Sequence, residues 1–171
     1  MTMAKYAVQN STDIAAQVAN TTTYITLAAI MASTGATGPA IQVRRAKIYD
    51  ILVGTNGTPA DNYMEWIVQR ATAGSTRTYA GIVSSMSNQL DPADATMASF
   101  AAVNSSGENF TVTAGTADFY VGVNQRASYR WVAAPGSELV MPATSSAGLL
   151  VRSKSGGYTG TSTVTTLFEE Q

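Results

Sequence analysis

Short segments in which apolar and polar residues alternate recur along the chain, separated by clusters of Gly, Pro, Asn and Ser. Alternation with a period of two is typical of half-buried β-strands, and turn residues at intervals of roughly ten to twenty positions favour a sandwich or barrel over βαβ units. We expect strands over Lys5–Gln9, Thr21–Ile30, Ile41–Val53, Tyr63–Ala73, Arg77–Met86, Asn109–Thr113, Asp118–Asn124, Ser128–Ala133, Glu138–Met141, Gly148–Ser153 and Ser162–Glu169.

The segment Ile41–Val53 departs from simple alternation, because Arg45 and Lys47 fall on the same parity as its apolar residues. Since a one-residue shift moves every later side chain to the other face of a sheet, such an interruption predicts a β-bulge or a register change. We expect it near residues 44–47.

Two segments have helical features. Thr12–Ala19 follows a suitable N-cap residue, and the Ala-rich stretch Asp94–Val103 follows an Asp-Pro pair. In the second, we expect Asp94 to cap the helix rather than to pair with Asp91 in a catalytic or calcium site. Residues 88–106 are long for a loop, and their role stays open.

The pattern as a whole predicts an all-β fold: an antiparallel β-sandwich with at most one or two short helices. A jelly roll is our first choice of topology. An immunoglobulin-like sandwich is the alternative, although the chain lacks the Cys pair of that fold. We expect residues 1–20 to form an N-terminal arm or first strand, and residues 21–171 to form a single β-sandwich domain.

The composition is unusual in its low charge. Only 12% of the 171 residues are charged, about half of the ~25% usual for a soluble domain. The sequence contains 23 Thr and 16 Ser, so polar uncharged side chains must cover much of the exterior. Such an exterior suits burial against other subunits. The net charge of −1 disfavours nucleic acid as a partner, because nucleic-acid binders present a basic face.

The absence of His and Cys excludes disulfides, zinc fingers, Cys nucleophiles and Ser-His-Asp triads. Nothing in the sequence selects a pair of carboxylates for glycan cleavage. We therefore expect no enzyme, and no catalytic, cofactor-binding or metal-binding residues. The most apolar stretch, Ile25–Ala32, is far shorter than the ~20 residues that cross a membrane. We expect no membrane partner and no signal peptide, hence synthesis in a cytoplasm.

The aromatic side chains of this sequence either form an exposed platform for a sugar or pack in the core. We expect three that occupy alternating strand positions to lie in the core: Trp66, Tyr129 and Trp131. Four tyrosines are expected to be partly exposed: Tyr6, Tyr24, Tyr79 and Tyr158.

The C-terminal half arranges its turns and strands in a distinctive order. From Trp131 to Lys154 a strand ends in an Ala-Pro-Gly turn, and a Pro-Ala-Thr segment leads into a strand that starts at Gly148. A final Thr-rich strand ends in Phe168-Glu169-Glu170. Together with the basic strand Ile41–Val53, these segments resemble a group of small phage head proteins over about two-thirds of the chain.

This resemblance implies a capsid decoration (cement) protein of a tailed bacteriophage: a jelly-roll homotrimer on the capsid exterior of the virion. Such a protein clamps neighbouring major capsid proteins, stabilises the expanded head, and carries no catalysis. The lack of Cys agrees with assembly in a reducing bacterial cytoplasm.

We expect the capsid contact on residues 1–17, an arm-like terminus, or at the only basic cluster. The residues concerned are Lys5, Tyr6, Arg44, Arg45 and Lys47. The alternative function is a receptor- or carbohydrate-binding jelly-roll domain of a phage fibre or spike, which would place Trp or Tyr on an exposed face.

Overall fold

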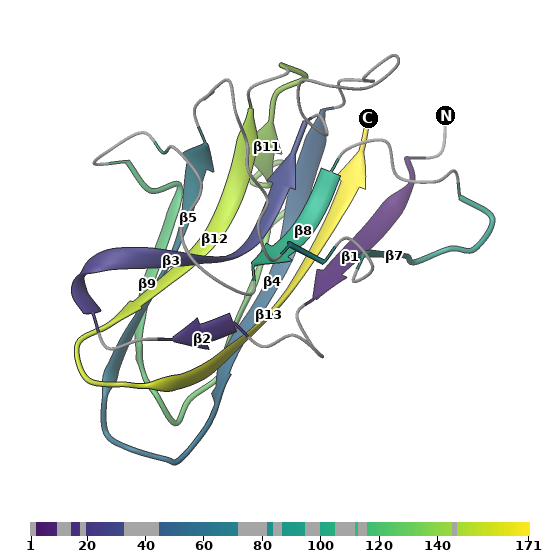
Figure 1. The fold of residues 1–171 in the computed structure, drawn as a ribbon. Coiled ribbons are helices and arrows are strands. Elements are labelled where there is room, and N and C mark those ends of the chain that lie inside the picture. The colour runs from purple at the N-terminus through teal and green to yellow at the C-terminus, as the bar shows by residue number, and fades with distance from the viewer. Residues whose placement is uncertain are drawn as a thin grey trace.

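A computed structural model gives the fold of the chain (Figure 1). The structure describes residues 3–9, 15–17, 20–32, 45–71, 82–83, 87–94, 100–104, 112, 116–144 and 147–171. Within these residues the strands are β1 (Lys5–Gln9), β2 (Ala15–Gln17), β3 (Asn20–Met31), β4 (Ala46–Asn56), β5 (Tyr63–Ala71), β6 (Ile82–Val83), β7 (Ser87–Gln89), β8 (Phe100–Asn104), β9 (Phe119–Asn124), β10 (Tyr129–Val132), β11 (Leu139–Met141), β12 (Gly148–Ser155) and β13 (Gly160–Glu170).

These strands form two antiparallel sheets that pack face to face (Figure 1). One sheet has the order β10-β4-β13-β1-β7, with β11 also on β4 and β2 also on β13. The other has the order β6-β8-β3-β12-β5-β9. The predicted all-β antiparallel sandwich is therefore confirmed.

Four of the strand pairs are nested along the chain. The first strand, β1, pairs with the last, β13; β3 pairs with β12, β4 with β10, and β5 with β9. Each step inward from the two ends of the chain thus gives the next pair, and successive pairs alternate between the sheets. The N- and C-terminal strands lie side by side as a result (Figure 1).

A β-bulge in β4 sets which side chains enter the core. Leu167 pairs with Asp50 while its neighbour Phe168 pairs with Ile48, so Tyr49 is the extra residue. The bulge lets Ile48 and Ile51 both point inward, where each is buried, although they are three positions apart. The predicted irregularity exists, but it lies two positions beyond residues 44–47.

The core between the sheets includes Trp66, which is 1% exposed. Tyr129 and Trp131 are half-buried and pack on Phe119, with ring centroids 6.0 and 5.7 Å away. The prediction of a core position is confirmed for Trp66, whereas Tyr129 and Trp131 pack against the edge of the core and stay partly exposed. Because Trp66 is enclosed, it cannot serve as a sugar platform.

Tyr6 and Tyr158 are each only 2% exposed, so the prediction that they are partly exposed is wrong. Tyr6 lies on Phe168, with ring centroids 5.5 Å apart. The Tyr158 hydroxyl donates to the Thr161 carbonyl and accepts from the Thr161 N–H. A Cβ on Gly160 would come within 2.4 Å of that hydroxyl, so the missing side chain makes room for the buried ring. Tyr24 is half-buried, and Tyr79 lies outside the described residues.

The two helical predictions are wrong where the structure describes them. Ala15–Gln17 is β2, which pairs with β13, and Phe100–Asn104 is β8, which pairs with β3. Residues 95–99 lie outside the described ranges. The Asp94 carboxylate accepts a hydrogen bond from the Lys5 backbone N–H (3.1 Å), and so fastens the end of its turn to β1.

Candidate binding surfaces

The solvent-facing side of the seven-stranded sheet is the first candidate surface. Along β13 the even-numbered residues from Ser162 to Glu170 are buried and the odd-numbered ones point outward. Pairing register extends this outward set to the neighbouring strands. We call the set the outer face: Lys5, Ala7, Gln9, Lys47, Tyr49, Asp50, Leu52, Arg130, Val132, Thr163, Thr165, Leu167 and Glu169.

The outer face is apolar where β4 pairs with the edge strand β10. Leu52 is 44% exposed and Val132 is 58% exposed, and they lie diagonally across the β4–β10 pair. The nearby Asp50 carboxylate receives a forked ion pair from Arg130, with Nε 3.1 Å from Oδ1 and Nη2 2.5 Å from Oδ2. This pairing neutralises the charge beside the two apolar side chains, and leaves a patch suited to a protein surface.

Three of the predicted contact residues gather at one end of the outer face. Lys5 and Lys47 both pair in register with Glu169, and the Lys47 Nζ lies 3.6 Å from its Oε1. Arg45 precedes β4 at the same end and its guanidinium binds the Gln171 side chain. The sheet therefore brings Lys5 next to Arg45 and Lys47, which come 40 and 42 positions later in the sequence.

The remaining predicted contacts are Tyr6, Arg44 and the N-terminal segment. The buried Tyr6 side chain points into the core, so its selection as a surface contact is corrected. Arg44 lies outside the described residues. Lys5–Gln9 pairs with β13 on one side and β7 on the other, so the strand alternative, not the arm, describes these residues.

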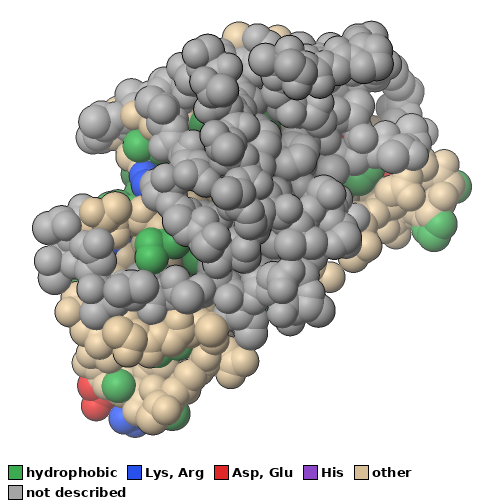
Figure 2. Space-filling model, in the orientation of Figure 1, with side chains coloured by type: hydrophobic (Ala, Val, Ile, Leu, Met, Phe, Trp, Pro, Cys, Tyr) green, Lys and Arg blue, Asp and Glu red, His purple; other side chains and the backbone are tan. Residues whose placement is uncertain are grey.

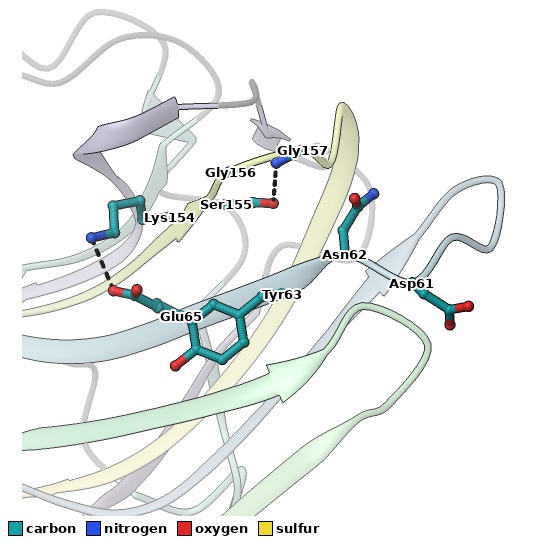
Figure 3. Close-up of a pocket in the computed structure, with 8 residues that line it drawn as sticks. All are labelled: Asp61, Asn62, Tyr63, Glu65, Lys154, Ser155, Gly156 and Gly157. Atoms are coloured by element: carbon teal, nitrogen blue, oxygen red, sulfur yellow. Dashed lines mark hydrogen bonds and ion pairs between the residues drawn. The ribbon is translucent and has the colours of Figure 1, made fainter.

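The second candidate surface is a cleft of about 380 Å³ where β5 begins and β12 ends (Figure 3). It opens to solvent on the six-stranded sheet, so it is separate from the outer face. Its lining residues are Asp61, Asn62, Tyr63, Glu65, Lys154, Ser155, Gly156 and Gly157. A Cβ on Gly157 would come within 2.6 Å of the Asn62 Oδ1, so this glycine makes room for the Asn62 side chain at the wall of the cleft.

Glu65 is the centre of the polar network in this cleft. Its Oε2 accepts from the Tyr24 hydroxyl at 2.6 Å and lies 3.0 Å from the Lys154 Nζ (Figure 3). Burial raises the pKa of Glu65, but the hydrogen bonds from Tyr24 and Lys154 outweigh burial and lower that pKa below its usual value. Glu65 is therefore an ionised acceptor at neutral pH. The Lys154 Nζ also lies 4.7 Å from the centre of the Tyr24 ring.

Tyr63 lines the cleft and contacts a second exposed tyrosine, Tyr120. Tyr63 is 54% exposed and Tyr120 is 56% exposed, and their hydroxyls are 2.8 Å apart. A Cβ on Gly122 would come within 2.0 Å of the Tyr63 hydroxyl, so this glycine lets the ring lie across β9. The hydrogen bond with Tyr63 raises the pKa of Tyr120 to about 12. The Tyr120 hydroxyl therefore stays protonated at neutral pH.

We expect the Tyr24–Glu65 hydrogen bond to make stability fall at alkaline pH. Burial and the bond to Glu65 raise the pKa of Tyr24 from 10.0 to about 12 in the folded protein. Its contribution is therefore complete below pH 10 and is lost as pH rises through about 12. Urea unfolding at successive pH values should give a weaker alkaline loss for Tyr24→Phe than for the wild type. An identical loss in both proteins would contradict this assignment.

Comparison of the chain with protein-family models, with curated proteins and with solved structures gives no match. Among the described residues no helix is long and apolar enough to cross a membrane. In the same part of the chain, no group of three or more His, Cys, Asp or Glu side chains is placed to hold a metal ion. The two surfaces are therefore interpreted from their own chemistry.

Proposed function

We propose that the chain is a capsid decoration protein of a tailed bacteriophage. In this proposal it assembles as a homotrimer, binds the outer surface of the head, and clamps neighbouring major capsid proteins. The observation that carries the proposal is the outer face, where exposed Leu52 and Val132 lie next to a neutralised ion pair. An exposed apolar patch on an ordered sheet is typical of a protein–protein interface.

We also propose that the sandwich is a jelly roll. In this topology the chain folds as one long hairpin that is rolled up, so pairs form from the ends inward. The pairs β1–β13, β3–β12, β4–β10 and β5–β9 follow that order. This nesting supports the topology that the sequence resemblance implies for phage decoration proteins.

We assign the apolar part of the outer face to the contact between subunits. A permanent interface is more apolar than a docking contact, because its two sides are never exposed separately. On the face that Figure 2 shows, few described side chains are acidic or basic, in agreement with the low charge of the chain as a whole. The outer face does carry charges, but those of Asp50 and Arg130 beside its apolar part are paired with each other. Leu52 and Val132 would otherwise face water in the free protein.

We assign the basic end of the outer face to the capsid. Lys5, Arg45 and Lys47 lie together there, and their charges favour approach to an acidic surface. A trimer carries three copies of this cluster, so binding gains avidity. Because it would bind the expanded shell alone, the trimer would stabilise that state by mass action.

The proposal is tested by solution mass and by head binding. Light scattering after gel filtration should give about 53 kDa, three times the 17.8 kDa of the chain. Expanded heads prepared without the protein should bind it in co-sedimentation, and bound heads should withstand a higher temperature before release of DNA. A monomer that does not sediment with heads would overturn the proposal.

The cleft favours a second candidate, a receptor- or carbohydrate-binding jelly-roll domain of a fibre or spike. Exposed Tyr63 and Tyr120 are the observation behind it. The two candidates differ in the head-binding assay, since a fibre or spike domain would be trimeric in solution yet would not sediment with heads.

A further inference from the structure

The cleft on the six-stranded sheet is lined by polar side chains with little net charge, because its acidic groups are paired with basic ones. The negative charge of Glu65 is balanced by Lys154 at 3.0 Å. The carboxylate of Asp61, at the rim, is paired with Arg126 at 3.3 Å. A ligand with a full charge of either sign would have to displace one of these pairs, so the cleft suits an uncharged polar ligand.

The lining offers both donors and acceptors within a small space. Glu65 accepts hydrogen bonds, Lys154 donates them, and the Asn62 amide does both. Figure 3 places Tyr63 and Glu65 at the start of β5, with Lys154 facing Glu65 from β12 and Asn62, just before β5, directed toward Gly157. Adjacent sugar hydroxyls, each a donor and an acceptor, match this alternation.

The ring of Tyr63 supplies the apolar component. It is 54% exposed, and its hydroxyl is held by Tyr120, so the ring is fixed in place with open surface. Fixed aromatic rings with one polar tip bind ligands that are apolar on one side and polar on the other. A pyranose ring has this character, with C–H groups on its faces and hydroxyls at its rim.

From these observations we propose that the cleft binds a neutral saccharide. The sugar ring lies on Tyr63, and its hydroxyls bond to Glu65, Lys154 and Asn62. The volume of about 380 Å³ is near the lower end of the ~300–1,000 Å³ of small-molecule sites. Because the cleft opens to solvent, it accommodates the terminal unit of a longer glycan. This site does not depend on the capsid role, because it lies on the other sheet.

Saturation-transfer NMR on the full chain tests the proposal. The probes are glucose, galactose, mannose and N-acetylglucosamine, with N-acetylneuraminic acid as an anionic comparison. We expect saturation transfer to the ring C–H protons of at least one neutral sugar. Tyr63→Ala and Glu65→Gln should each weaken its binding about tenfold or more, through loss of stacking and of a charge-assisted hydrogen bond.

Two variants serve as controls. Tyr63→Phe keeps the ring, and should retain most of the binding that Tyr63→Ala loses. Asp118→Asn neutralises a carboxylate in a matched ion pair with Arg70 (2.9 Å) on the same sheet, outside the cleft. It should leave sugar binding unchanged. Circular dichroism and thermal midpoints establish that each variant is folded.

The proposal is overturned by any of three results. These are no transfer to any neutral sugar, transfer to the anionic sugar alone, or binding that survives both Tyr63→Ala and Glu65→Gln in folded protein. None of these results bears on solution mass or head binding. The two proposals therefore fail separately.

Discussion

Replacing Trp66 with alanine is expected to lower the free energy of unfolding by about 3–5 kcal/mol. The side chain is 1% exposed and fills the space between the sheets. Its removal loses apolar burial and leaves a cavity that the flanking strands β12 and β9 hold open, because both are paired to β5. Since whole domains are stable by roughly 5–15 kcal/mol, this one change removes a large part of the total.

Urea unfolding followed by circular dichroism measures the effect. Trp131→Ala is the matched control: Trp131 is half-buried against Phe119 near the edge of the core, so its loss should cost clearly less. Equal stability of Trp66→Ala and wild type would contradict the burial of Trp66. The expected loss also means that reduced glycan binding by Trp66→Ala would report unfolding rather than a sugar contact.

Much of the fold follows from local sequence pattern. The expected bounds of β1, Lys5–Gln9, are the observed ones, and β9, β10 and β11 begin one residue after their predicted starts. In these segments alternation and flanking turn residues agree, so local and tertiary preferences select the same conformation. The prediction fails where they disagree. Residues 15–17 and 100–104 contain helix-favouring Ala, but pairing with β13 and β3 makes them strands.

Burial was harder to predict than strand position. Tyr6 and Tyr158 carry a polar hydroxyl, yet both rings are enclosed. For Tyr158 the cause is a hydrogen bond to Thr161 and the absence of a side chain at Gly160, which only the folded turn brings together. The bulge at Tyr49 likewise depends on its partner β13, and not on β4 alone.

The cleft could not be found from sequence spacing. Tyr24, Glu65 and Lys154 come from β3, β5 and β12, and their meeting depends on cross-strand register. One signal was available: Tyr63 and Glu65 alternate with buried Met64 and Trp66, so they share the outward side of β5. The sequence alone predicts the basic cluster around Arg45 and Lys47. The position of Lys5 beside it follows only from the pairing of β1 with β13 and of β13 with β4.

Replacing Leu52 and Val132 together with aspartate is expected to separate the proposed trimer into monomers. Both side chains are exposed in the single chain, so the substitutions should leave folding stability nearly unchanged. In a closed trimer each interface would instead bury two unpaired carboxylates, beside the carboxylate of Asp50. The desolvation of these charges should weaken association more than about 100-fold.

Light scattering at micromolar concentration measures the change as a shift from about 53 kDa towards 17.8 kDa. Leu90→Asp is the matched control, because Leu90 is 47% exposed but lies beyond β7, away from Leu52 and Val132. It should stay trimeric. Head binding by the double variant should also fall steeply. A monomer keeps its basic cluster of Lys5, Arg45 and Lys47, but it loses the avidity that three such clusters give a trimer. A folded double variant that remains trimeric would place the subunit contact elsewhere, whereas a trimer that no longer binds heads would assign Leu52 and Val132 to the capsid contact.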